Sequence, residues 1–301
     1  MYHGIINVYK EKGFTSFDVV AKMRGICGQK KIGHTGTLDP EAEGVLPVCL
    51  GKATKVCDML TDSDKAYRAV LLLGVETDTQ DTIGKVLAQR DTSDLDEARV
   101  CRAIREFIGD IRQVPPMYSA LKVNGKKLCD LARAGITVER KAREITIYEI
   151  QIEKIVLPRV EMTIHCSKGT YIRTLCHDIG QKLGCGGAME SLTRIRAAGY
   201  CLEDAVRLSE LQQLKEEGKL DTVIRPIGDV FMEYPALTIS ESAQKMLQNG
   251  NALQERQFLS VQKEHYSQPV RVYDADGKFA AIYRYNKEKQ CFCPVKMFLE
   301  D

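Results

Sequence analysis

The segment that decides the fold is residues 33–48, which reads GHTGTLDPEAEGVLPV. Its glycines and prolines exclude a long helix and a continuous strand. Apolar residues such as Leu38 and Val45 alternate with the turn-forming ones, which predicts a packed loop rather than a linker. Pro40 restricts Asp39 to extended geometry. The loop therefore displays a carboxylate on a fixed backbone, five residues after His34.

Asp39 has two interpretations on these grounds. Asp-Pro dipeptides are common in ordinary turns, so the segment could be a turn followed by a buried strand. The alternative is a nucleophilic or acid–base carboxylate in a preorganised pocket. The local sequence leaves both open.

The segment resembles, without a gap, the catalytic motif of the TruB family of tRNA pseudouridine synthases, Gly-His-Thr-Gly-x-Leu-Asp-Pro-x-Ala-x-Gly-x-Leu-Pro. Glu43 departs from the small or hydroxyl-bearing residue that is usual at its position. Three further stretches extend the resemblance, which spans residues 4 to about 200: KAYRAVLLLG at 65–74, RQVPPMYSALK at 112–122 and SKGTYIR at 167–173.

The resemblance implies an α+β pseudouridine synthase fold, a mixed, mostly antiparallel sheet flanked by helices and loops. It implies a catalytic domain over residues 1–232, with an RNA-clamping insertion at about 115–143. A small C-terminal α+β domain over 233–301 would be a PUA-like RNA-binding module. The insertion is basic and contains Asn124-Gly125, a hairpin-turn signal.

Hydrophobic periodicity and turn residues predict the individual elements. Strands are expected at 5–8, 65–74, 145–152, 160–166 and 291–299, and helices at 54–60, 95–108 and 172–183. Thr15 and Asp18 predict a capping box at a helix start. Ser209 is expected to cap a helix that ends at Gly218, and a short helix is expected from Ser240 to Gly250.

The resemblance assigns the catalytic roles. Isomerising uridine breaks the N1–C1′ bond and forms a C5–C1′ bond, and needs no redox equivalent or energy source. Asp39 is the candidate that attacks the sugar, attacks the base or deprotonates C2′, and the sequence does not choose among these. Arg173, in the first turn of the helix at 172–183, is expected to keep Asp39 ionised. Tyr67 is expected to stack on the base and to help its deprotonation at C5.

Further residues are expected to bind the substrate. His34 would occupy the space that the flipped uridine leaves, and Tyr171 and Leu192 would wall the pocket. The remaining expected RNA contacts are Lys10, Lys122 and Arg194.

Composition narrows the class of protein. The chain has 301 residues, 44% of them hydrophobic, and a net charge of only +2. Residues 10–31 and 115–145 each carry a local charge of +4, the footprint of a phosphate-contacting surface or simply of two solvated faces. No apolar run approaches the roughly 18 residues of a membrane span. We therefore expect tRNA, through its T stem-loop, as the partner, and no membrane or obligatory protein partner.

Cysteine usage points to a reducing compartment. Eleven cysteines, with no secretory signal, favour the cytoplasm over a disulfide framework. Their spacing does not suit a zinc site, and no phosphate-binding glycine-rich loop is present. We expect a cytoplasmic monomer that uses no metal or cofactor.

Two other functions remain open. A hydrolase acting on a nucleoside or glycosidic bond could use Asp39 as nucleophile, with Glu41 or Glu43 as the second carboxylate. A tRNA-folding chaperone would bind RNA without chemistry. The predicted function is conversion of the T-loop uridine of tRNA (U55) to pseudouridine, through base flipping and Asp39.

Overall fold

The computed structural model describes residues 1–299, and the chain divides into two compact units. The larger unit contains residues 7–48 and 56–220. The smaller contains residues 1–6 and 49–55 and the chain from 221 onward. Within residues 1–299, no helix has the length and apolar character required to cross a membrane.

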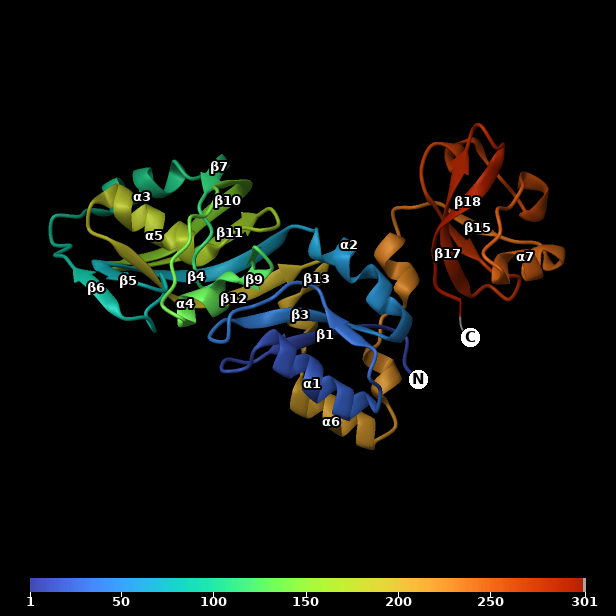
Figure 1. Cartoon of the computed structure of the whole chain (residues 1–301), viewed down its shortest axis with the longest axis horizontal. Helices are drawn as coiled ribbons and strands as arrows, with labels where there is room; N and C mark the ends of the chain where they lie inside the picture. The colour runs from blue at the N-terminus through green and yellow to red at the C-terminus, as the bar shows by residue number, and fades with distance from the viewer. Residues whose placement is uncertain (300–301) are drawn as a thin grey trace. The chain divides into compact units, whose positions relative to one another are not determined.

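One ten-stranded sheet organises the fold (Figure 1). Its strands are β1 (Gly4–Lys10), β2 (Ile32–His34), β3 (Glu43–Leu50), β4 (Lys65–Leu73), β7 (Gly109–Gln113), β10 (Arg143–Val156), β11 (Arg159–Cys166), β12 (Gly187–Ala197), β13 (Tyr200–Cys201) and β14 (Val206–Arg207). Their order is β14–β1–β3–β12–β4–β11–β10–β7, with β2 and β13 paired to β3 and β12. The pairs from β12 through β7 are antiparallel, whereas β1–β14 and β3–β12 are parallel. The predicted α+β class, with a mixed and mostly antiparallel sheet, is confirmed.

Alternation in the sequence explains how the sheet buries one face. In β11, Val160, Met162, Ile164 and Cys166 are fully buried, while the residues between them are at least partly exposed. Helices α3 (Glu97–Arg105) and α5 (Ile172–Leu183) pack against this face, and their apolar side chains join the same core. Gly180 lets α5 approach closely, because a Cβ there would lie 2.1 Å from the backbone nitrogen of Gly187. The helix that carries Arg173 is thereby seated on β12.

Local sequence signals predicted some helix ends correctly and others incorrectly. Helix α1 (Ser16–Cys27) has the predicted capping box between Thr15 and Asp18. Helix α3 ends at Arg105 instead of residue 108, because the chain turns there into β7. The prediction that Ser209 caps the next helix was wrong: α6 (Leu208–Glu216) already includes Ser209, and Glu210 accepts a hydrogen bond from the Arg207 amide.

Within the segment at 33–48, residues 35–42 form a loop between β2 and β3, and the two ends belong to these strands. As expected, no continuous strand runs through the segment, although Pro47 itself lies inside β3. The Pro47 carbonyl accepts a hydrogen bond from the Thr35 amide, which follows β2. Gly44 is required at φ +105°, because a Cβ would lie 2.3 Å from the Arg194 carbonyl oxygen on β12.

Smaller elements surround this sheet. Near it lie α2 (Cys57–Thr61), preceded by a 3₁₀ helix (Gly51–Val56), and the hairpin β5 (Val75–Thr77) and β6 (Val86–Gln89). The predicted insertion contains β8 (Lys122–Val123), β9 (Lys126–Lys127) and α4 (Leu128–Arg133). Asn124 and Gly125 have positive φ angles of 50° and 81°, so the predicted hairpin turn is confirmed.

The smaller unit contains a four-stranded sheet in the order β15–β18. Its elements are β15 (Ala236–Thr238), α7 (Gln244–Gln248), β16 (Val270–Tyr273), β17 (Phe279–Asn286) and β18 (Cys291–Met297). The expected strand at the end of the chain is present as β18. Helix α7 is shorter than predicted, because Glu241–Ala243 form a 3₁₀ turn after Ser240. The domain boundary at 232/233 stays a prediction.

Candidate active site

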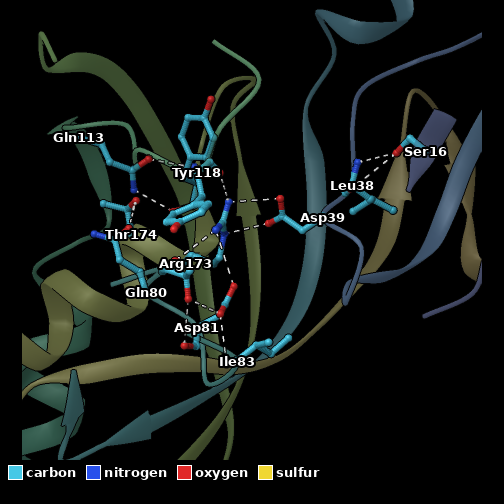
Figure 2. A network of polar contacts seen from close by, with 12 residues as sticks. Ser16, Leu38, Asp39, Gln80, Asp81, Ile83, Gln113, Tyr118, Arg173 and Thr174 are labelled. Atoms are coloured by element: carbon cyan, nitrogen blue, oxygen red, sulfur yellow. Dashed lines mark hydrogen bonds and ion pairs between the residues drawn. The ribbon is translucent and has the colours of Figure 1, made fainter. Parts of the chain in front are cut away.

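An ion pair between Asp39 and Arg173 lies at the centre of the candidate site (Figure 2). Arg173 Nε lies 2.9 Å from Asp39 Oδ2, and Arg173 Nη2 donates to Asp39 Oδ1 at 3.2 Å. The two contacts form the bidentate geometry that a planar guanidinium makes with a carboxylate. The structure thus brings together the two residues that the sequence analysis paired.

The loop that carries Asp39 is held by side chains from two other elements. Ser16, the first residue of α1, accepts a hydrogen bond from the Leu38 amide at 2.9 Å and donates to the Leu38 carbonyl. Lys10, at the end of β1, is fully buried, and its ammonium donates to the carbonyls of Pro40 and Ala42. The backbone on both sides of Asp39 is therefore fixed.

Arg173 is held by groups other than Asp39. Its Nη2 donates to the Tyr118 carbonyl at 2.7 Å, and its Nη1 donates to the Thr79 carbonyl at 3.2 Å. Arg173 Nη1 also lies 3.7 Å from Asp81 Oδ2. Only 5% of the Arg173 side chain is exposed, so the guanidinium is buried among acceptors.

Asp81 is a member of this site that the sequence analysis missed. It belongs to a turn between β5 and β6, in which the Ile83 amide donates to Asp81 Oδ1 (Figure 2). Thr79 Oγ1 donates to the same oxygen. Gln80, at a positive φ of 65°, accepts a hydrogen bond from Thr174 Oγ1 on α5. The density of Asp and Thr at 77–82 was a turn signal, but it did not indicate that the turn reaches Arg173.

Gln113 positions the start of α5 and was likewise missed. Its amide donates to the Tyr171 carbonyl at 3.0 Å and accepts from the Tyr171 amide at 2.8 Å. Tyr171 is the residue before α5 and makes no side-chain capping bond. The fully buried Gln113 side chain thus fixes the backbone two residues before Arg173.

A pocket of about 580 Å³ opens onto the ion pair. Six predicted site residues line it: Asp39, Tyr67, Tyr171, Arg173, Leu192 and Arg194. Arg143 and Lys168, both exposed, add positive charge to its walls. Three predicted residues are not among those that line it: His34, Lys10 and Lys122. Lys122 lies instead in a second cavity, within the insertion.

Burial sets the protonation equilibria of the pocket. The pocket leaves 37% of the Asp39 side chain exposed, yet burial raises the pKa of Asp39 above its ordinary value. The Arg173 guanidinium opposes this shift and Asp81 adds to it. Burial also raises the pKa of Tyr67 to about 12, against an opposing effect of Arg194. Burial lowers the pKa of His34, which favours a neutral imidazole.

This arrangement favours covalent or acid–base chemistry by a carboxylate. A bidentate guanidinium stabilises the ionised form of Asp39, while Tyr67 and Leu192 provide an apolar wall beside it. Within residues 1–299, no group of three or more His, Cys, Asp or Glu side chains is arranged to hold a metal ion.

Solved structures with a related fold come from protein and ribonucleoprotein complexes. The chain is 25% identical, with a TM-score of 0.72, to a chain in the structure of an H/ACA ribonucleoprotein bound to a substrate RNA containing 2′-deoxyuridine. The match covers 99% of this chain and 86% of that one. A Cbf5–Nop10–Gar1 complex gives 27% identity, the same TM-score, and coverage of 99% and 85%. The fold is therefore that of the pseudouridine synthases.

Sequence comparison narrows the class. The sequence model of the TruB family pseudouridylate synthase N-terminal domain matches residues 24–172, and that of the tRNA pseudouridylate synthase B C-terminal domain matches residues 173–231. A tRNA pseudouridine synthase B from Lachnoclostridium phytofermentans is 50% identical, over 99% of this chain and 100% of that protein. One from Clostridium perfringens is 44% identical over the same shares. The chain belongs to the TruB family of pseudouridylate synthases.

Proposed function

We propose that this protein converts the T-loop uridine of tRNA (U55) to pseudouridine, with Asp39 as its catalytic carboxylate. The observation that carries the proposal is the bidentate Asp39–Arg173 pair at a pocket of about 580 Å³. A pocket of this size suits one nucleoside-sized group. Membership of the TruB family and the names of its relatives support tRNA as the substrate.

The target base has to leave its stack to enter the pocket, which costs a few kcal/mol. Tyr67 and Leu192, on the adjacent strands β4 and β12, offer flat and apolar surfaces to a flipped uracil. Tyr171 forms another part of the wall. His34, half-buried in β2, is the side chain assigned to the vacated position in the RNA.

Asp39 acts in its ionised form, as a nucleophile or as a base. Arg173 stabilises that form and is itself held by the Tyr118 and Thr79 carbonyls, so the pair is already oriented before substrate binds. Tyr67, which lines the same pocket, is the residue assigned to help remove the C5 proton after the new C–C bond has formed. No external reductant, oxidant or metal enters this scheme.

The remaining assignments concern the molecule's organisation and setting. Residues 1–232 form the catalytic domain, with an RNA-clamping insertion at about 115–143. Residues 233–301 form a PUA-like RNA-binding domain. Lys122 and Lys10 belong to the proposed RNA-binding set, although the ammonium of Lys10 is engaged by loop carbonyls. The eleven cysteines of the sequence favour a reducing compartment and so support a cytoplasmic setting, and the protein is assigned as a monomer.

The hydrolase alternative is less well supported. Glu41 forms an exposed ion pair with Lys12, and Glu43 accepts a hydrogen bond from Thr193. Neither residue lines the pocket, so neither stands opposite Asp39 as a general acid would.

The test is incubation with an unmodified tRNA transcript, followed by mapping of pseudouridine and measurement of RNA mass. Wild-type protein should modify the T-loop uridine without changing the mass. Asp39→Asn should bind tRNA with near-normal affinity, keep its fold and form no product, because an amide can neither attack nor accept the proton. Free uracil in the wild-type reaction would favour the hydrolase, and normal turnover by Asp39→Asn would refute the assignment.

A further inference from the structure

Arg194 occupies an unusual position between the two strands that supply the site. It lies on β12, in register with Gly44 of β3 on one side and with Tyr67 of β4 on the other. Its side chain is fully buried, with an exposed fraction of 0%. A buried guanidinium is retained only where its donors find acceptors, so its contacts define its role.

The donors of Arg194 reach both ends of the catalytic loop. Its Nε donates to the Val45 carbonyl at 2.7 Å, and its Nη2 donates to the Gly36 carbonyl at 3.2 Å. Asp39 lies between these two residues in the chain. A planar guanidinium can hold two carbonyls in a fixed relation, because its donors are arranged in a rigid fork.

The same guanidinium acts on Tyr67. Arg194 lies close enough to Tyr67 to oppose the effect of burial on the tyrosine's pKa. Burial lowers the pKa of Arg194, and Tyr67 opposes that shift. One buried side chain therefore contacts the loop of the carboxylate and faces the aromatic residue of the pocket.

We propose that Arg194 is a positioning residue: its guanidinium joins the two ends of the Asp39 loop to the strand that bears Tyr67, and so fixes the carboxylate and the aromatic wall in one geometry. This inference rests on the proposed function and deepens it. It assigns Arg194 a role other than the expected RNA contact: although Arg194 lines the pocket, both of its carbonyl partners belong to the protein and its side chain is fully buried.

The chain offers a matched control on the same strand. Arg196 lies two residues further along β12 and is exposed. We compare Arg194→Lys and Arg194→Gln with Arg196→Gln. The single-turnover rate is measured with saturating tRNA transcript. Affinity for tRNA and its salt dependence are measured in the Asp39→Asn background, so that no product forms.

A positioning role for Arg194 predicts that its replacement lowers the single-turnover rate without weakening tRNA binding. Misplacing a reacting group by about 1 Å costs on the order of 100-fold, so Arg194→Gln should lower the single-turnover rate by about that factor. Arg194→Lys keeps the charge and one donor direction and should recover part of the rate. Affinity and the salt slope should match those of Arg196→Gln. A salt slope reduced by about 1 would show a phosphate contact instead and would overturn the proposal.

Amide hydrogen exchange tests the positioning role of Arg194 without an activity assay. The Leu38 amide donates to Ser16 Oγ on α1, and the Ala42 amide donates to the Asp39 carbonyl within the loop. They should exchange faster in Arg194→Lys than in wild type, while amides of the four-stranded sheet of the smaller unit should not change. If amide exchange at Leu38 and Ala42 and the single-turnover rate were both the same as in wild type, the positioning role of Arg194 would be refuted. If wild-type protein formed no pseudouridine, the proposed function would fail, but this measurement would still decide the role of Arg194.

Discussion

Arg173 lies between two carboxylates with different geometries. Asp39 makes the bidentate contact, whereas Asp81 approaches a separate nitrogen at 3.7 Å. Asp81 thus keeps the guanidinium oriented without replacing Asp39 as its main partner. The charge of Asp81 also has a cost, since it adds to the raised pKa of Asp39.

This geometry predicts that Asp81→Asn extends activity to lower pH but decreases the maximal rate. The rate requires ionised Asp39, so it falls as pH decreases through the pKa of Asp39. Removing the Asp81 charge lowers that pKa, and the acid limb of the single-turnover rate should move to lower pH. The maximal rate should fall by roughly 10-fold, because Arg173 is less firmly positioned.

Asp94→Asn is the control, because Asp94 is an exposed carboxylate in the same acidic stretch of sequence. It should change neither the acid limb nor the maximal rate. A shift of the acid limb to higher pH in Asp81→Asn would contradict the electrostatic role given to Asp81.

Helix α5 begins without a side-chain cap of its own, although its first turn carries Arg173. Gln113, from β7, supplies the missing contacts through its reciprocal bonds with the Tyr171 backbone. The start of this helix is therefore determined by a strand that precedes it by about 60 residues rather than by its own sequence.

Gln113→Leu should decrease the free energy of unfolding by about 1–3 kcal/mol, since it leaves the Tyr171 amide and carbonyl unpaired at a buried site. The rate should fall as well, because Tyr171 precedes Arg173 by two residues. Urea unfolding and single-turnover assays measure the two effects. Gln151→Leu, at an exposed position of β10, should show neither; equal stability of the two variants would contradict the capping role.

The elements that could be predicted from sequence are those whose signals are local. The alternation in β11, the apolar stripe of α5 and the capping box at Thr15 each depend on a few neighbouring residues. The end of α3 and the start of α6 were mispredicted, because the turn into β7 and the Arg207–Glu210 contact outweighed the helical pattern.

The residues of the candidate site likewise fall into those that local motifs predict and those that depend on contacts between distant segments. Asp39, Tyr67 and Arg173 were found through motifs, and the pairing of Asp39 with Arg173 followed from the need of a buried carboxylate for a cation. Asp81 and Gln113 act through contacts between distant segments, which no local pattern encodes. The buried position of Arg194 was missed for the same reason.

Charge over the whole chain is nearly balanced, at +2, but the insertion is basic. Its hairpin exposes Lys122, Lys126 and Lys127, which lie along one cavity. Lysines that neutralise backbone phosphates release counterions, which makes such binding depend on salt.

Replacing these three lysines with glutamine should weaken tRNA binding and reduce the salt slope by up to about 3, roughly one for each phosphate that is no longer neutralised. Thermal stability should change little, because the three side chains are exposed. Replacing all three with arginine keeps the charge and should preserve both affinity and slope. A salt slope unaffected by the glutamine variant would remove the insertion from the RNA-binding surface.

The contact between Asp39 and Arg173 joins residues 134 positions apart in the chain. During synthesis the carboxylate leaves the ribosome long before its guanidinium partner exists. Contacts of such long range also form slowly, because closing a large loop costs entropy before the contact rewards it. A chain that ends before residue 173 therefore contains the carboxylate without its guanidinium partner, so the ion pair forms only after helix α5 has begun to be made.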